Sequence, residues 1–253
     1  MKTGGEINEK DGGKSVMELM KFFGESSNKI ERYEWAKDSQ ENVRRNEKIF
    51  GKEWYYYKKE ISYIINEEGF RTRSFIDLDW SNCVVVLGCS NIKGTGNAIE
   101  DTVCVQLEKI LNIPVISLGS SGAGVDLTCR NSLVLHNTRP FPKAVVQVWT
   151  GLDRYADFSP PHGIKKHMAN RSGYCFKHDW GMRSQYYIDS DRALWLGKTI
   201  YSEHSFFKHT ADTLGIDFID EKDQARDLDH PGYLTNRLAA EQIAQKLIEK
   251  GLK

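Results

Sequence analysis

The chain has 253 residues, and its 35 basic and 35 acidic side chains give a formal net charge of zero. A chain of this length can form one α/β domain with an appendage and can bury a sizeable core. The balanced charge argues against nucleic acid and anionic membranes as partners, because both are bound through basic surfaces.

Composition also bears on the location of the protein. No apolar run approaches the ~20 residues of a membrane span, and the polar, glycine-rich start lacks the apolar core of a signal peptide. Five cysteines are an odd number, and Cys83, Cys104 and Cys129 lie in apolar or helical stretches. We therefore expect a cytoplasmic protein with reduced, buried thiols and no membrane partner.

Residues 1–80 are predicted to be an N-terminal tail followed by an aromatic-rich extension. The pattern predicts one helix over Val16–Phe23, a second over Asp38–Phe50, and an extended or hairpin segment over Tyr55–Ile65. We expect this extension to pack on the main domain rather than to fold by itself.

Residues 81–253 are predicted to form the main domain. Three apolar runs alternate with helical patterns, which is typical of a parallel sheet covered by helices on both faces. The apolar runs, read as strands, are Cys83–Leu87, Ile113–Leu118 and Ala144–Trp149. The domain is therefore predicted to be a three-layer α/β/α fold.

The second half of this domain is less regular. Residues 151–190 break the alternation and are predicted to be an inserted functional loop or lid. A helix is predicted over Asp191–Leu214 and a short strand over Ile216–Ile219. The last helix is predicted to begin at Pro231, which suits a first helical turn.

Ser90 follows the first predicted strand, and therefore lies at the carboxyl edge of the sheet, where α/β folds bind their ligands. Far downstream, the Asp227-x-x-His230 spacing offers a histidine that could take the serine proton and an aspartate that could orient its ring. A capping role for Ser90 is the alternative, and Asp229 is a second candidate for the orienting carboxylate.

Several segments resemble the SGNH (GDSL-type) hydrolase family. Its first sequence block is similar to Gly88-Cys89-Ser90, its second to Ile116 through Gly122, and its last to Asp227 through Pro231. Upstream, Ile65 through Arg71 resembles the N-x-x-G-F-R segment of many relatives. The resemblance implies a flavodoxin-like parallel sheet and a serine esterase that forms an acyl-serine intermediate.

Two positions depart from the family pattern. Cys89 replaces the usual aspartate, and the third block, Trp149 through Asp153, lacks the asparagine that donates to the oxyanion in relatives. The N–H groups of Ser90 and Gly122 are the expected donors to the oxyanion. The third donor stays open, with the Thr150 hydroxyl, the Gly151 N–H and Asn91 as its candidates.

The predicted reaction is hydrolysis of short O-acyl esters, with O-acetyl sugars favoured by the aromatic and polar residues after the third strand. The side chains expected to contact the substrate are Asn91, Asp153, Arg154 and Tyr155. Acyl transfer to a sugar hydroxyl and a non-catalytic binding module are the alternatives.

No cofactor is expected from the motifs. No C-x-x-C or H-E-x-x-H spacing indicates a metal, and Gly94-Thr95-Gly96 lacks the spacing and the lysine of a phosphate loop. We interpret this glycine-rich stretch as a flexible turn into the next helix.

Overall fold

The computed structural model describes residues 21–157, 165–168 and 177–253, and its centre is a five-stranded parallel sheet. The strand order places the first strand of the domain second in the sheet, which is the flavodoxin-like order. The predicted fold class is thus confirmed. In spatial order the strands are β4 (Val115–Gly119), β3 (Val84–Gly88), β5 (Ala144–Trp149), β8 (Ile200–Ser205) and β9 (Asp217–Phe218).

The strands are buried on both faces, which explains their continuous apolar sequences. Within β3, Val84 and Val86 join the core on one side, whereas Val85 and Leu87 join the core on the other. Successive side chains of a strand point to opposite faces, so one apolar run supplies both cores.

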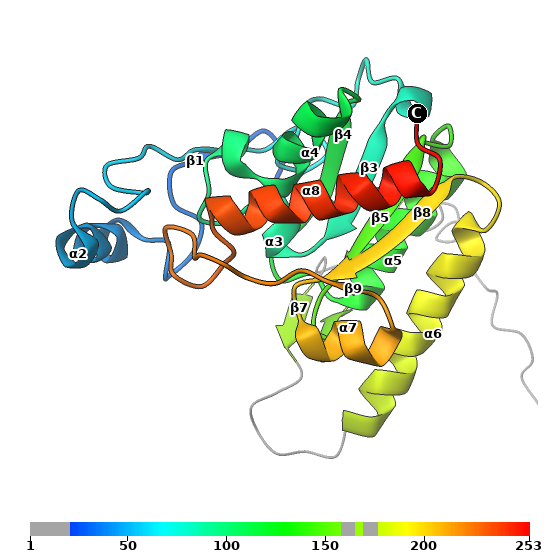
Figure 1. Cartoon of the computed structure of the whole chain (residues 1–253). Coiled ribbons are helices and arrows are strands. Elements are labelled where there is room, and N and C mark those ends of the chain that lie inside the picture. The colour runs from blue at the N-terminus through cyan, green and yellow to red at the C-terminus, as the bar shows by residue number, and fades with distance from the viewer. Residues whose placement is uncertain (1–20, 158–164, 169–176) are drawn as a thin grey trace, which may run out of the picture.

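Two pairs of helices cover these two faces (Figure 1). Helices α4 (Val103–Leu111) and α8 (Tyr233–Glu249) bury their apolar residues on the Val84 side. Helices α5 (Val125–Thr138) and α6 (Lys177–Trp195) contribute to the cores on the opposite face. The result is the three-layer arrangement expected from the sequence.

The predicted helix over Asp191–Leu214 is wrong. This stretch holds the end of α6, the sheet strand β8 and a short helix, α7 (Lys208–Leu214). Strand β8 pairs with β5 along its whole length, but it buries Ser202, His204 and Ser205 rather than aliphatic residues. Polar side chains inside the core removed the apolar pattern that identified the other long strands.

Residues 151–190 are not one long loop. They contain an antiparallel hairpin of β6 (Arg154–Asp157) and β7 (Lys165–Met168), followed by the first turns of α6. Several aromatic residues invoked for sugar binding lie outside the described residues, namely Phe158, Tyr174 and Phe176.

The N-terminal extension contains helix α2 (Gln40–Phe50) and strand β1 (Ile30–Glu31), which pairs with β2 (Tyr63–Ile64). Helix α2 begins two residues after the predicted start, because the Ser39 hydroxyl caps it by accepting from the Asn42 N–H. The predicted helix over Val16–Phe23 lies mostly outside the described residues, and its last three residues are not helical. The division at residue 80 stays a prediction.

Three short elements complete the description: α3 (Ser90–Lys93), η1 (Trp80–Asn82) and η2 (Ile99–Asp101). Within the described ranges, no helix is long and apolar enough to cross a membrane. The cysteines that the structure describes are all free and buried, in line with the expected reduced thiols, and they are Cys83, Cys89, Cys104 and Cys129.

Candidate active site

Ser90 is the first residue of α3, and Cys89 alone separates it from strand β3. The backbone of this turn packs closely against Gly119. A Cβ atom at Gly119 would lie only 2.4 Å from the backbone nitrogen of Lys93. The glycine at the end of β4 therefore lets α3 rest on the neighbouring strand end. Ser90 as a whole is 7 % exposed, so the residue is largely buried.

The structure brings Ser90, His230 and Asp227 together in one chain of hydrogen bonds. His230 Nε2 lies 2.9 Å from Ser90 Oγ, and His230 Nδ1 lies 2.6 Å from Asp227 Oδ2. The serine and the histidine are 140 residues apart in sequence. Two loops at the same edge of the sheet thus place an imidazole between a hydroxyl and a carboxylate.

A tight turn sets the position of the carboxylate. Asp227 Oδ1 accepts the backbone N–H groups of Asp229 at 3.1 Å and His230 at 3.2 Å. Leu228 adopts a left-handed conformation with φ of 57°, which is uncommon for a residue with a branched side chain. Such backbone strain is often found at functional sites.

The two candidate orienting carboxylates have different partners. Asp227 contacts the His230 ring, whereas Asp229 forms an ion pair with Lys37 near the surface. Burial acts to raise the pKa of the Asp227 carboxyl, but the hydrogen bond and charge of His230 outweigh it and hold that pKa below its ordinary value. The carboxylate that contacts the imidazole is therefore that of Asp227 rather than that of Asp229.

The loop Gly94-Thr95-Gly96 is tightly packed rather than flexible. Gly94 and Gly96 both have positive φ, at 79° and 77°. A Cβ atom at Gly96 would lie 2.7 Å from the Ala225 Cβ and 2.9 Å from Asp227 Oδ1. Glycine is thus required for the close approach of this loop to the carboxylate. No motif in the sequence indicated this contact.

Arg71, from the N-x-x-G-F-R segment, holds the same loop. Its guanidinium is buried and donates to the backbone carbonyls of Gly94 at 2.7 Å and Asn97 at 2.9 Å. The side chain of Asn97 in turn donates to the Pro231 carbonyl at 2.9 Å. These bonds connect the turn that carries Ser90 to the turn that carries His230, which gives the segment a physical role.

The N-terminal extension also reaches the site. The indole Nε1 of Trp35 donates to Asp227 Oδ2 at 2.9 Å, and the indole ring meets the His230 ring edge to face at 5.5 Å. No sequence signal identified Trp35, because the contact spans 192 residues and no motif surrounds it.

A buried lysine joins the N-terminal extension to the turn that carries Ser90, called here the nucleophile turn after its predicted role. Lys93, three residues after Ser90, is 3 % exposed and donates to Glu25 and Glu34, each at 2.6 Å. Ser121 joins this network through its backbone N–H, which donates to Glu25 at 3.0 Å. The extension therefore contacts both the nucleophile turn and the loop that carries Gly122.

The expected oxyanion donors lie at neighbouring strand ends. Ser90 follows β3, Gly122 follows β4 with φ of 68°, and Thr150 and Gly151 follow β5. Thr150 is 2 % exposed, and its hydroxyl has no hydrogen-bond partner among the described residues. A buried polar group is normally hydrogen-bonded, so an unpartnered hydroxyl at this strand end is unusual.

The residues expected to contact the substrate differ in exposure. Asn91 is buried beside Ser90, Asp153 is exposed, and Arg154 and Tyr155 are partly buried. The Arg154 guanidinium lies 5.4 Å from the centre of the Phe207 ring. Their role in binding stays a prediction.

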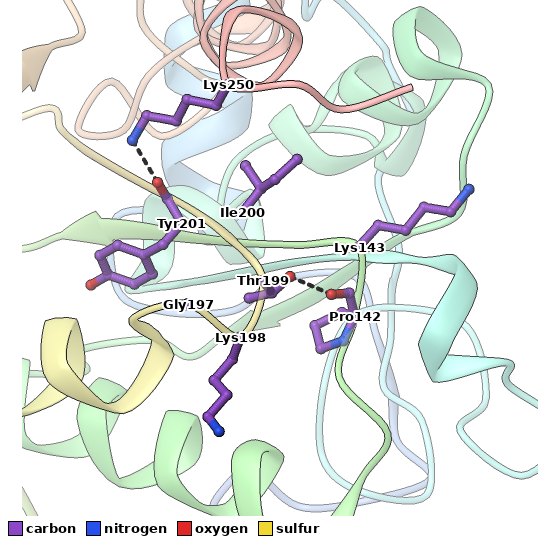
Figure 2. Close-up of a pocket in the computed structure, with 8 residues that line it drawn as sticks. All are labelled: Pro142, Lys143, Gly197, Lys198, Thr199, Ile200, Tyr201 and Lys250. Carbon is purple, nitrogen blue, oxygen red and sulfur yellow. Dashed lines mark hydrogen bonds between the residues drawn. The ribbon is translucent and has the colours of Figure 1, made fainter.

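A hollow lies at the amino-terminal edge of the sheet, opposite the edge that carries Ser90 (Figure 2). Its lysines point in different directions, and Lys250 donates to the Tyr201 carbonyl at 2.6 Å. Ligand sites bring polar groups together, so this hollow lacks their character. Among the described residues, no group of three or more acidic, histidine or cysteine side chains could hold a metal ion.

The fold and this constellation define an α/β protein with a hydrogen-bonded serine, histidine and aspartate at the carboxyl edge of its sheet. Neither a protein-family model nor a curated protein sequence matches the chain.

Solved structures with similarity to the chain include three esterase or lipolytic proteins. A carbohydrate acetylesterase family member from Sinorhizobium meliloti is 15 % identical, with a TM-score of 0.42, over 65 % of this chain and 96 % of that one. A family two carbohydrate esterase from Clostridium thermocellum, solved with cellohexaose, is 14 % identical, with a TM-score of 0.45, over 68 % and 65 %. A member of the lipolytic G-D-S-L family from Veillonella parvula is 13 % identical, with a TM-score of 0.42, over 66 % and 96 %.

These likenesses are distant. The match spans nearly all of the Sinorhizobium and Veillonella chains but about two thirds of the Clostridium chain. At such low identities and TM-scores they carry no information on the reaction or substrate of this protein. The fold assignment therefore depends on the strand order and the layers described above.

Proposed function

We propose that the protein is a serine hydrolase that cleaves short O-acyl esters, with O-acetyl sugars as its preferred substrates. The observation that carries this proposal is the hydrogen-bonded chain from Ser90 through His230 to Asp227, with distances of 2.9 and 2.6 Å. A free hydroxyl is a weak nucleophile, and an adjacent base oriented by a third group is the arrangement that activates it.

In the first half of the reaction, Ser90 Oγ attacks the ester carbonyl carbon while its proton passes to His230 Nε2. The carbonyl π electrons move to oxygen, and a tetrahedral oxyanion forms. When it collapses, the bond to the alcohol oxygen breaks and His230 returns the proton to that oxygen. The alcohol leaves, and the acyl group stays on Ser90.

In the second half, water takes the place of the alcohol. His230 accepts a proton from the water as its oxygen attacks the acyl carbon, and the proton is then passed to Ser90 Oγ as the acyl bond breaks. A carboxylic acid is released and the serine is restored. Asp227 keeps the imidazole in the tautomer with a proton on Nδ1 throughout.

The oxyanion is assigned to the N–H groups of Ser90 and Gly122 and to the hydroxyl of Thr150. The buried, unpartnered hydroxyl supports this choice over the Gly151 N–H, which stays the alternative. Thr150 directly follows β5, and β5 neighbours β3, the strand that precedes Ser90.

Thr150→Val tests the hydroxyl, because valine has nearly the same shape but no donor. Loss of one oxyanion donor is expected to lower kcat by ~10²–10³, with KM little changed. The thermal midpoint should not fall, since the hydroxyl that is removed has no hydrogen-bond partner among the described residues. A wild-type kcat for this variant would eliminate the hydroxyl and favour the Gly151 N–H.

Labelling with a fluorophosphonate probe, mapped by mass spectrometry, tests the nucleophile. We expect the probe on Ser90, and we expect Ser90→Ala to abolish both labelling and hydrolysis of p-nitrophenyl acetate. Labelling of another serine would refute the assignment. A well-folded protein that is inert to probe and ester would favour the non-catalytic binding module instead.

The substrate class is proposed from the surface beside His230. The Trp35 ring is 37 % exposed there, with Lys37 and Asp229 close to it. An aromatic face among charged groups suits a sugar ring, which has apolar C–H faces and polar edges.

Two comparisons test the substrate class. The rate on p-nitrophenyl acetate should exceed that on the octanoate ester, and acetylated sugars should be better substrates than simple acetates. A preference that grows with acyl length would refute the sugar-ester proposal and leave the Ser90 chemistry intact. Transfer of the acetyl group to an added sugar faster than to water would favour the acyltransferase alternative.

A further inference from the structure

Asp227 Oδ2 has two side-chain donors in the structure. His230 Nδ1 lies 2.6 Å from this oxygen, and Trp35 Nε1 lies 2.9 Å from it. The other carboxylate oxygen, Oδ1, accepts backbone N–H groups of its own turn. Trp35 is therefore the partner that the N-terminal extension supplies to the Asp227 carboxylate. The other donors belong to the turn from Asp227 to His230.

Burial of apolar surface does not explain the position of the Trp35 side chain. Its side chain keeps 37 % of its exposure, whereas tryptophans of the core such as Trp149 and Trp195 are almost fully buried. Lys37 holds the same stretch to the catalytic turn by its ion pair with Asp229 and lies 5.4 Å from the indole centre. The polar end of the indole is thus fixed more firmly than its apolar face.

We infer that Trp35 is a positioning residue of the active site, which acts by fixing the Asp227 carboxylate through its indole N–H. With this bond in place, Oδ2 is held toward His230 Nδ1, and the imidazole is held toward Ser90. The inference depends on the proposed hydrolase function for its kinetic consequences, but the hydrogen bond itself can be tested without them.

Trp35→Phe removes the donor and keeps an aromatic ring beside His230. Hydrogen bonds to charged groups are among the strong ones in proteins, so kcat on p-nitrophenyl acetate should fall roughly 10- to 100-fold. KM should change little, because the ester contacts neither the carboxylate nor the indole N–H.

Trp54→Phe is the matched control. Trp54 belongs to the same extension and contacts Phe50 and Tyr56 rather than the catalytic turn. We expect it to leave kcat unchanged, even where it lowers the thermal midpoint as much as Trp35→Phe does. Equal kcat values for the two variants would overturn the inference.

A comparison of kcat, KM and the thermal midpoint separates positioning from general loss of structure. Trp35→Phe should lower kcat with KM little changed, whereas Trp54→Phe should move the thermal midpoint alone.

A measurement on the wild-type indole covers the case in which Trp35→Phe does not fold or the protein does not hydrolyse esters. In protein labelled with ¹⁵N-tryptophan, the Trp35 indole N–H resonance should shift strongly in Asp227→Asn and little in Asp229→Asn. An unmoved resonance would refute the bond. A shifted resonance in a protein that is inert to the fluorophosphonate probe would refute the hydrolase proposal and leave the placement of Trp35 standing.

Discussion

The carboxyl edge of the sheet and the N-terminal extension contribute to the same site in different ways. The sheet edge supplies the groups that would touch a substrate, Ser90 and His230, on short turns directly after strands or before α8. The extension supplies partners for the groups behind them, such as the indole of Trp35 on Asp227. One region carries the groups proposed to react, and the other donates hydrogen bonds to the groups behind them.

The seam between the two regions is made of buried charges as well as apolar contacts. Asp38 in the extension is fully buried and accepts from Arg226, the residue before the orienting aspartate, at 2.8 Å. Lys93 in the nucleophile turn is bound in the same manner by Glu34. Removing one member of such a pair leaves a buried charge without a partner, which is strongly destabilising. These ion pairs therefore hold the extension against the site.

The largest expected effect comes from the sheet edge. Asp227→Asn should lower kcat by up to ~10⁴, because the imidazole would then favour the wrong tautomer. Asp229→Asn is the matched variant, two residues away, and should cost little, because its carboxylate reaches Lys37 rather than the ring. Steady-state kinetics on p-nitrophenyl acetate measures both. The reverse ranking would move the orienting role to Asp229.

The next effect comes from the extension and concerns stability. Asp38→Asn should lower the free energy of unfolding by about 3–5 kcal/mol, since the Arg226 guanidinium would stay buried without its counter-ion. The matched variant is Glu241→Gln, which breaks the exposed Arg237–Glu241 pair on α8 and should change stability little. Urea denaturation of both variants gives the comparison. Equal midpoints would mean that the extension does not hold the catalytic turn.

The sheet edge could be predicted from the sequence for a physical reason. Parallel strands buried on both faces leave long apolar runs, and the residue after each run lies at the ligand-binding edge. Ser90 was placed in this manner, whereas Asp227 and His230 were placed by their Asp-x-x-His spacing, and the structure brings the three together. Their catalytic roles, and the binding roles of Asn91 and Arg154, stay predictions.

Strand β8 and the long-range contacts of the extension could not be predicted, for two different reasons. Strand β8 lies inside the sheet, but Ser202 and His204 satisfy each other at 3.0 Å within the core and so replace the apolar residues that mark a strand. The Trp35 and Asp38 contacts join residues 192 and 188 positions apart. No local periodicity reports a contact at that separation, and a single tryptophan in a polar stretch has no motif around it.

The smallest expected effect is a dependence of stability on pH that arises where the two regions meet. The pKa of Asp227 is lowered in the folded protein, because the bonds from His230 and Trp35 outweigh the effect of burial. A carboxyl whose pKa is depressed on folding stabilises the protein above its unfolded pKa of about 3.9, and this contribution is lost as the pH falls through the lower folded value. The difference in unfolding free energy between the wild type and Asp227→Asn should therefore be present at neutral pH and shrink in acid.

Urea denaturation at a series of pH values measures this difference, and Trp35→Phe sharpens it. Without the indole donor, the carboxylate loses one of the bonds that favour its charged form, so the folded pKa of Asp227 should move toward the unfolded value. The pH-dependent part of the stability should then be smaller in Trp35→Phe than in the wild type. A pH dependence of the same size in both proteins would mean that the sheet edge stabilises the Asp227 charge without help from the extension.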